Sequence, residues 1–397
     1  MNAKELARQR ILAEVPLLVG LSHSLHARPE LAYAEVESAR LLADALEAKG
    51  LAVERQVHGL PTAFSATAGR TGPNLVLCAE YDALPEIGHA CGHNIIAASA
   101  VGAALALAEM VDALGVRVTV LGTPAEESGG GKIDLLRAGA FEDAAIAMMV
   151  HPAPYEVTEM PTLAWARLDV TYHGKEAHAS ATPHLGRNAL DAVHLAYMAI
   201  GALRQHIRHS ERIHGIITQG GDAPNIVPKL AGARFFVRAR DLDELEPLKE
   251  RVLRCFEAGA LATGCELEVQ WLGNEYDRLR TNETLASLYQ ANLEVLGRTA
   301  LPRALLLDRP ASTDMGNVSQ AVPSIHPLMS IESLPAVNHQ AEFTARTVSP
   351  AGDRAVVDAA LTLAWTALDV ATGPDVLARV VEEFAAATPP DALTPTP

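Results

Sequence analysis

Apolar positions in the first 150 residues follow two spacings, one typical of helices and one typical of strands. Residues 35–49 place apolar side chains three or four positions apart, with Gly50 as a stop signal, and predict an amphipathic helix. Residues 75–79 form a short apolar run after a Gly-Pro-Asn turn, which is typical of a buried strand. The predicted elements that follow are a buried helix at 95–110, a strand at 116–120, a helix at 132–138 and a strand at 144–150. Strands that alternate with helices favour an α/β domain with a mainly parallel sheet.

The pattern changes near residue 163. The elements predicted beyond that point are, in order, strand 167–173, helix 187–206, strands 212–219 and 231–238, helix 243–262 and strand 265–271. This β-α-β-β-α-β order is that of a ferredoxin-like domain. After about residue 276 the alternation resumes, up to an apolar helix at 351–372, and the proline-bearing tail from residue 387 is expected to be irregular. The sequence thus predicts a discontinuous α/β domain, residues 1–162 and 276–397, that carries an inserted domain, residues 163–275.

Composition narrows the class of protein. Hydrophobic residues make up 49% of the 397 positions and charged residues 20%, as in a globular chain. The net charge of −16 disfavours nucleic acid and anionic membranes as partners. The charged N-terminus predicts no secretory signal, and the longest apolar run, 95–108, is too short to span a bilayer. Four cysteines without a framework spacing indicate free thiols and a cytoplasmic location.

Residues able to carry chemistry gather directly after the predicted strands. Cys91 and His93 flank Gly92, between strand 75–79 and the buried helix, where open α/β sheets bind their ligands. A thiolate and an imidazole two positions apart can both bind a zinc-like ion. On its own, the pair fits equally well a buried thiol and an internally hydrogen-bonded histidine.

Two further groups follow the next two strands. Glu126 and Glu127 lie in a glycine-rich loop, where one carboxylate can bind a metal while its neighbour stays free as a general base. His151 comes at the end of strand 144–150. Each group alone also fits a role without chemistry: the two glutamates could be a solvated acidic pair, and the histidine could be a packing residue. Because three consecutive strand ends supply sulfur, nitrogen and oxygen donors at one sheet edge, together they favour a metal site.

Seven motifs in a fixed order then indicate a family. They are EYDALPEIGHACGHN, GTPAEESGGGK, VHPAP, GKEAHAS, GGDAPNIVP, STDMGNVS and NHQAEF, preceded by LHARPELAYAE near residue 25. With them the chain resembles the aminoacylase/carboxypeptidase metallohydrolases. Within that family it is similar to the amidohydrolase branch of p-aminobenzoyl-glutamate hydrolase, hippuricase, auxin-conjugate hydrolases and β-alanyl-lysine-type dipeptidases. The matches cover most of the chain.

The resemblance implies roles for residues of the α/β domain. It makes five residues the ligands of two divalent ions: Cys91, His93, Glu127, His151 and His339. It makes Glu126 the general base, which moves a proton from the bridging water to the leaving amine. Asp82 matches an aspartate that orients one of the metal ligands.

The resemblance also extends to the insert. His178 matches a histidine that reaches the active site of the partner subunit and steadies the oxyanion, and Asn225 matches a substrate-contacting asparagine. A homodimer through the inserted domain follows from these matches.

Some positions depart from the family pattern or leave their role open. Glu80 occupies a place that distant branches fill with a metal-binding histidine, while Asn94 and Ser128 replace a common Asp and Gly. Three residues lie in family-like loops, and whether they line the site is open: His89, Asp314 and His326.

The implied activity is hydrolysis of a linear amide in an N-acyl amino acid, an aminobenzoyl-glutamate-like compound or a dipeptide, by a water that two metals activate. A thiolate ligand favours Zn²⁺, with Mn²⁺ as the alternative. A short-peptide carboxypeptidase or dipeptidase is a second interpretation. A catalytically silent metal- or ligand-binding relative is a third, which the presence of Glu126 disfavours. The acyl group stays open, since one methylene changes specificity by only ~1–3 kcal/mol.

Overall fold

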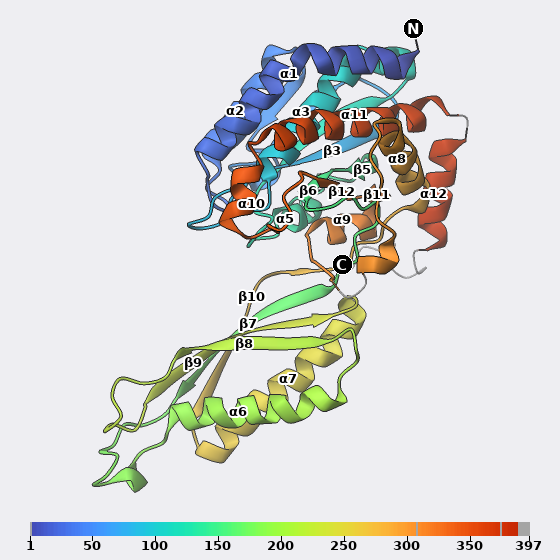
Figure 1. The fold of residues 1–397 in the computed structure, drawn as a ribbon. Helices are drawn as coiled ribbons and strands as arrows, with labels where there is room; N and C mark the ends of the chain where they lie inside the picture. The colour runs from blue at the N-terminus through green and yellow to red at the C-terminus, as the bar shows by residue number, and fades with distance from the viewer. Residues whose placement is uncertain (1, 307–308, 374, 388–397) are drawn as a thin grey trace. The chain divides into compact units, whose positions relative to one another are not determined.

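A computed structural model describes residues 2–306, 309–373 and 375–387 (Figure 1). The chain divides into two compact units, Met1–Pro161 with Leu279–Pro397, and Thr162–Arg278. These divisions fall within a few residues of the predicted domain boundaries. The tail expected to be irregular lies, from residue 388 onward, outside the described residues.

The first unit contains the following elements: α1 (Ala3–Ala27), α2 (Val36–Ala48), β1 (Ala52–Arg55), β2 (Phe64–Ala68), β3 (Asn74–Glu80), α3 (His93–Ala108), α4 (Val111–Leu114), β4 (Arg117–Thr123), α5 (Gly131–Arg137), β5 (Ala144–Met148), β6 (His151–Ala153), α8 (Glu283–Val295), α9 (Met315–Ala321), β11 (Ser324–Ile325), β12 (Leu328–Ser330), α10 (Ala341–Arg346), α11 (Pro350–Thr372) and α12 (Val376–Ala386).

The main sheet is mixed but mostly parallel, as predicted. Its strand order is β1-β2-β4-β3-β5-β11. The pairs β4–β3, β3–β5 and β5–β11 are parallel, whereas β1–β2 and β2–β4 are antiparallel. A small parallel pair, β6 with β12, continues beyond β5 and β11. Because β3, β4 and β5 run in one direction, the loops that follow them emerge at the same edge of the sheet.

Helices cover the main sheet on both faces (Figure 1), and nearly all residues of α3 are buried between the sheet and the other helices. One apolar cluster joins α1, α3 and α11 to the sheet, and another packs α5 and α9 on the opposite face. Among the described residues one helix, α11, is long and apolar enough to cross a membrane. Its most apolar window is 72% buried against the rest of the unit, as expected of a core helix.

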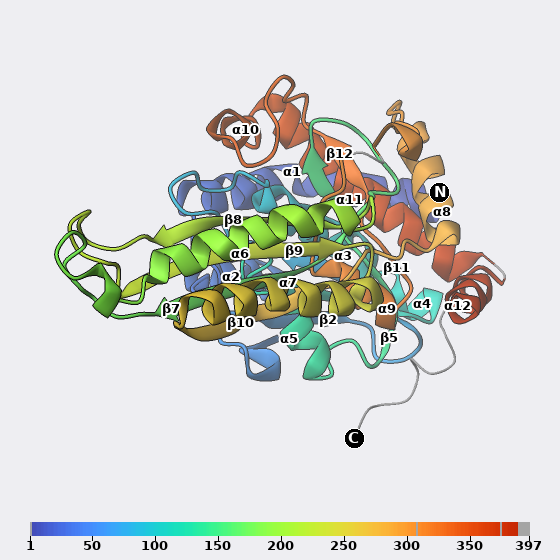
Figure 2. The same ribbon diagram turned by 90° about the horizontal axis from the view of Figure 1, so that it is seen from below.

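The second unit has the predicted ferredoxin-like arrangement. It consists of β7 (Ala164–His173), α6 (Ala189–Leu203), β8 (Arg212–Gln219), β9 (Leu230–Ala239), α7 (Leu242–Thr263) and β10 (Glu266–Tyr276). The antiparallel strand order is β10-β7-β9-β8, and α6 and α7 lie side by side on one face of this sheet (Figure 2). The edge strands are therefore β8 and β10.

Two sequence expectations differ from the structure. The first helix predicted from the apolar spacing lies at 35–49, yet α1 already spans Ala3–Ala27, with Pro16 inside the helix and charged residues between its apolar ones. The strand predicted at 144–150 ends two residues early, as β5 at Met148, and a second short strand, β6, follows at His151–Ala153. His151 therefore begins β6 and pairs with Leu328 of β12, where the sequence predicts that it follows a strand end. An apolar run alone does not reveal where one strand ends and the next begins with a new pairing partner.

Candidate metal centre

Four loops bring the chemistry-bearing side chains of the first unit together. The loop between β3 and α3 carries Cys91 and leads into His93, the first residue of α3. Gly92 between them has φ of 76°, and a Cβ there would lie 2.4 Å from Cγ of Pro152. Only glycine fits this turn without strain, and the turn points the thiol and the imidazole toward one place.

The ligand atoms form two overlapping triads. Those of Cys91, His93 and His151 lie within 4.8 Å of one another, and so do those of Cys91, Glu127 and His339. Nε2 of His339 lies 3.0 Å from Sγ of Cys91 and 3.5 Å from a carboxylate oxygen of Glu127. All five sequence-predicted ligands thus meet in one cluster, with Cys91 common to both triads.

Asp82 orients the most deeply buried of these groups. One of its oxygens lies 2.9 Å from Nδ1 of His93, and the other accepts the backbone N–H of Glu127, also at 2.9 Å. This contact turns Nε2 of His93 toward the cluster, where it is buried and has no hydrogen-bond partner among the described residues. A buried ring nitrogen left without a partner is costly unless a ligand completes it.

The chemistry of the donors fits divalent metal ions. Burial and the neighbouring His93 lower the pKa of His151 to about 4, so its imidazole is in the neutral form that binds metals. Nδ1 of His151 lies 2.8 Å from the carbonyl oxygen of Pro152, which leaves Nε2 for the cluster. Burial and the carboxylates of Glu127 and Glu126 raise the pKa of the Cys91 thiol well above its usual range. Only a bound cation would make the thiolate stable at this position.

Glu126 belongs to a third triad of this cluster, because its carboxylate and the ligand atoms of His93 and Glu127 lie within 4.8 Å of one another. Its carboxylate is 4.0 Å from Nε2 of His93, and it is 8% exposed. Burial, followed by the charges of Glu80 and Glu127, raises its pKa well above the usual range. The preceding Ala125 has φ of 61°, and its N–H donates to the buried Glu35 at 2.8 Å. Glu35 thus stabilises the strained turn that positions Glu126. The sequence did not predict this role, although Glu35 lies in the LHARPELAYAE motif.

The three residues left open by the sequence are all buried next to this cluster. His326 stacks on His151, with ring centroids 5.4 Å apart. Asp314 accepts a hydrogen bond from Nζ of Lys132 at 2.8 Å. The ring nitrogens of His89 are buried and lack hydrogen-bond partners within the described part of the chain. Lys132, which also pairs with Glu80, is the last residue of the GTPAEESGGGK motif, and sequence reasoning gives it no role.

The two predicted residues of the insert lie beside each other in the second unit. The N–H of Ala179 donates to the carbonyl of Asn225 at 3.0 Å, and His178 forms a β-bridge with Ile226. Nδ1 of His178 accepts the N–H of Ala181 at 3.2 Å, which places the ring proton on Nε2. His178 and Asn225 each lie on a loop segment of the insert, and Asn225 is exposed to solvent.

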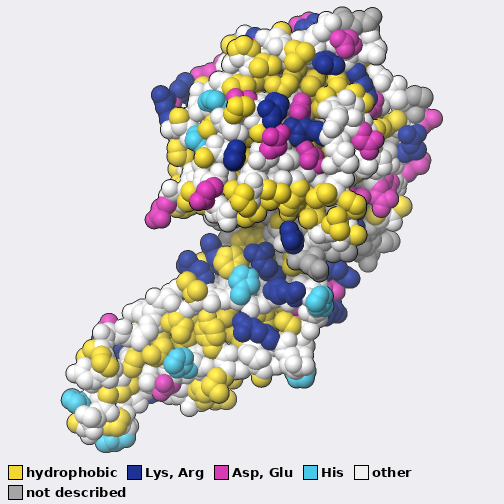
Figure 3. All heavy atoms as spheres, viewed as in Figure 1, with side chains coloured by type: hydrophobic (Ala, Val, Ile, Leu, Met, Phe, Trp, Pro, Cys, Tyr) yellow, Lys and Arg dark blue, Asp and Glu magenta, His cyan; other side chains and the backbone are white. Residues whose placement is uncertain are grey.

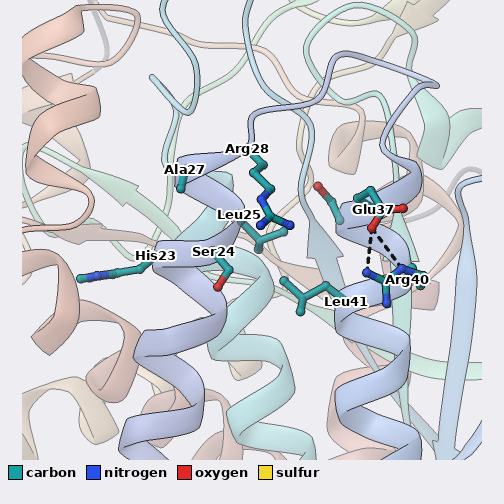
Figure 4. A pocket seen from close by; sticks show the side chains of 9 residues that line it. His23, Ser24, Leu25, Ala27, Arg28, Glu37, Arg40 and Leu41 are labelled. Carbon is teal, nitrogen blue, oxygen red and sulfur yellow. Dashed lines mark hydrogen bonds and ion pairs between the residues drawn. The ribbon is translucent and has the colours of Figure 1, made fainter.

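A separate pocket of about 310 Å³ lies between the end of α1 and the start of α2 (Figure 4). Three of its ionisable side chains are already paired, since Arg40 binds Glu37 at 2.7 Å and His23 binds Asp353 at 2.7 Å. None of the predicted site residues lines this pocket. The chemistry of the first unit is therefore centred on the metal-ligand cluster.

A metal-ligand cluster at the edge of a mostly parallel sheet, with a ferredoxin-like domain inserted in the chain, defines a two-domain metallohydrolase. Residues 161–263 match the model of the peptidase dimerisation domain of the M20 family. The mouse Xaa-Arg dipeptidase is 41% identical over 396 residues, which cover 96% of this chain and 92% of the relative. One of the subunits of the Escherichia coli p-aminobenzoyl-glutamate hydrolase is 36% identical over 61% of this chain and 55% of its own.

A solved structure shares the fold. It is a dinuclear metal-binding peptidase of the M20 family from Bacillus subtilis, with a TM-score of 0.70 at 21% identity, covering 90% of this chain and 98% of the other. Taken with the curated relatives, this shows that the chain belongs to the M20 family of metallopeptidases. It is a hydrolase of linear amide bonds, as the sequence motifs predicted.

A substitution of Asp82 tests whether its contact with His93 supports metal binding. We expect Asp82→Asn to lower the affinity for Zn²⁺ by about 10–100-fold, because the amide holds the imidazole less firmly and makes its Nε2 less basic. Chelator competition measures the affinity. Asp143→Asn is the matched control, since Asp143 also accepts side-chain hydrogen bonds but from Asn74 and Arg117, remote from the cluster. Equal affinities in the two variants would show that Asp82 does not support the site.

Proposed function

We propose that this chain is a dinuclear hydrolase in which five residues hold two divalent ions and Glu126 is the general base. The ligands are Cys91, His93, Glu127, His151 and His339. The supporting observation is the pair of donor triads that share Cys91, together with the carboxylate of Glu126 within 4.8 Å of the ligand atoms of His93 and Glu127. Two divalent ions bound there would polarise the scissile carbonyl and lower the pKa of a water molecule toward ~7. The thiolate favours zinc, with manganese as the alternative.

Glu126 has the environment of a group that both accepts and donates a proton. An amide has a poor leaving group, so the departing nitrogen needs a proton that the attacking water has lost. Glu126 takes that proton on its carboxylate and returns it to the amine. Its burial and the charges of Glu80 and Glu127 raise its pKa, which favours the protonated form from which the amine would receive its proton. Asp82 meanwhile keeps the His93 imidazole in the orientation that it needs as a ligand.

The substrate we favour is a dipeptide with a basic C-terminal residue. The mouse Xaa-Arg dipeptidase supports this choice, because its 41% identity extends over nearly the whole of both chains. The net charge of −16 would also attract a cationic substrate. An aminobenzoyl-glutamate-like compound is the second candidate, supported by the shorter match to the Escherichia coli hydrolase. The two candidates carry opposite side-chain charges, so the charge of the best substrate separates them.

We also propose that the insert forms a homodimer along β8 and α6. The strand β8 is an edge strand and carries Ile216, which is 64% exposed, while Met198 on α6 is 72% exposed. Arg204, directly after α6, donates to the carbonyl of Ile213 in β8 at 2.6 Å, so the end of this helix adjoins the edge strand. Apolar side chains are exposed over this part of the insert (Figure 3). An uncovered apolar edge of this kind is a template for pairing with a second copy.

In this dimer the partner subunit's His178 would steady the oxyanion of the reaction. Nε2 of His178 carries the ring proton, because Nδ1 accepts backbone N–H groups, and it is therefore a donor. Asn225 on the neighbouring segment would contact the substrate. The cytoplasmic location expected from the free cysteines stays a prediction.

A substrate panel tests the proposed activity. We expect metal-loaded protein to hydrolyse Ala-Arg and Ala-Lys with a kcat/KM at least about 10²-fold above that for Ala-Glu, because a site that pairs with a cation rejects an anion. N-acetyl amino acids and aminobenzoyl-glutamate complete the panel. If aminobenzoyl-glutamate is the fastest substrate, the second candidate replaces the first. If no amide is cleaved, the chain is a silent binding relative.

A pair of neighbouring substitutions tests the division of roles in the acidic loop. Glu126→Gln should lower kcat by about 10²–10⁴-fold and leave two metal ions per chain, because it removes only the general base. Glu127→Gln, the same change one residue later, should lower the metal content. Metal analysis and turnover are measured on the same samples. A Glu126→Gln protein that turns over normally, or that has lost metal, would contradict the assignment.

Subunit complementation tests the trans arrangement of His178. Homodimers of His178→Ala and of Glu126→Gln should each be nearly inactive. In a mixed dimer, the site with intact Glu126 belongs to the His178→Ala chain and receives His178 from its partner, so one site per dimer regains activity. If His178 acts within its own chain, no mixed site holds both residues. Mixed dimers verified by mass that stay inactive would therefore exclude the trans arrangement.

A further inference from the structure

A completely buried lysine lies next to the metal-ligand cluster. Lys132, near the start of α5, has no exposed surface, and its Nζ donates to Glu80 at 2.5 Å and to Asp314 at 2.8 Å. The backbone N–H of Lys132 donates to the second oxygen of Asp314 at 2.9 Å. Both carboxylates are themselves completely buried. An ammonium in such a place is stable only when carboxylates surround it, and the two carboxylates depend equally on the ammonium.

Glu126 makes a third carboxylate at the same place. The carboxylate oxygens of Glu80, Glu126 and Asp314 lie within 4.8 Å of one another. Three buried carboxylates at this spacing have the donor set and the negative charge that a hard divalent ion prefers. A cation is already present among them, and it is the ammonium of Lys132.

Glu80 faces the metal ligands with its other oxygen. Its Oε2 is buried, has no hydrogen-bond partner among the residues that the structure describes, and lies 3.4 Å from Nε2 of His93. Without Lys132, this carboxylate would be free to turn toward a metal ion. With Lys132 present, Oε1 of Glu80 accepts a charged hydrogen bond from the ammonium, which holds the carboxylate in place.

We propose that Lys132 is a positioning residue that acts as a built-in cation beside the metal centre. It keeps Glu80 and Asp314 from becoming metal ligands, leaves Glu126 unligated and thereby limits the site to two ions. This inference rests on the two-metal site of the proposed function. It also gives a physical reason for the presence of a glutamate at position 80, since its negative charge is used to bind Lys132 and not a metal.

Metal stoichiometry tests the inference. Lys132→Ala removes the ammonium and leaves room among the three carboxylates. Loaded with Mn²⁺ and freed of excess metal, the wild type should hold two ions per chain and Lys132→Ala should hold three. The matched control is Lys132→Ala combined with Glu80→Gln and Asp314→Asn, which has the same space without the negative charge. It should hold two ions.

A second measurement covers the case in which Lys132→Ala is too unstable to isolate without metal. The thermal midpoint of Lys132→Ala should then rise with Mn²⁺ at concentrations that already saturate the wild type, because an ion bound only to the folded state stabilises it. The midpoint of the combined variant should not rise in that range.

The outcomes distinguish the role of Lys132 from the two-metal site on which it rests. Two ions in Lys132→Ala, or a Lys132→Ala protein that Mn²⁺ does not stabilise while the combined variant folds, would overturn the role of Lys132 and leave the proposed function intact. Fewer than two ions in the wild type would overturn the proposed two-metal site and, with it, this inference.

Discussion

The structure depends on one electrostatic constraint, which is that several acidic groups are held together out of water at the carboxyl edge of a sheet. Glu80, Glu126 and Asp314 converge within 4.8 Å, and Cys91 and Glu127 lie beside them. Burial and mutual repulsion raise the pKa of Glu126 and of the Cys91 thiol, so the site is unfavourable without positive charge. The chain itself supplies the ammonium of Lys132, which binds Glu80 and Asp314. In the function that we propose, metal ions supply the rest.

The fold meets this constraint with rigid elements. Three parallel strands deliver their following loops to one edge, and α3, buried on all sides, begins at His93. Such a helix cannot move without disrupting the packing of α1 and α11 against it, so the imidazole is held firmly. The backbone is strained at Ala125 and at His339, both with positive φ, and each flanks or supplies a functional group. The packing of the rest of the unit offsets the unfavourable free energy of these backbone conformations.

The insert is a self-contained fold with its own apolar core and its own helices on one face of the sheet. Its exposed apolar residues include Ile216 on the edge strand β8 and Met198 on α6, and its two candidate functional residues lie on neighbouring loop segments. These features suit a domain whose function is to meet a second copy, in agreement with the dimerisation-domain family that it matches. In the function that we propose, the first unit supplies the metal ligands and the general base, whereas the insert supplies the dimer contact together with His178 and Asn225.

The sequence by itself determined the order of most elements, the ferredoxin-like insert and the metal-ligand types, because these depend on local periodicity and on short motifs such as Cys91-Gly92-His93. Local patterns did not determine which donors meet: the sequence grouped the five ligands only through the family resemblance, and the tertiary structure brings them together. Cys91 and His339 are 248 positions apart, and no local pattern links them. The same holds for Lys132 and Asp314, separated by 182 positions, and for Glu35 and Ala125, separated by 90. Local patterns reveal which side chains are able to bind a cation. Whether an acidic group receives a metal or a lysine depends on packing between distant segments, since burial makes each charge dependent on its nearest neighbour.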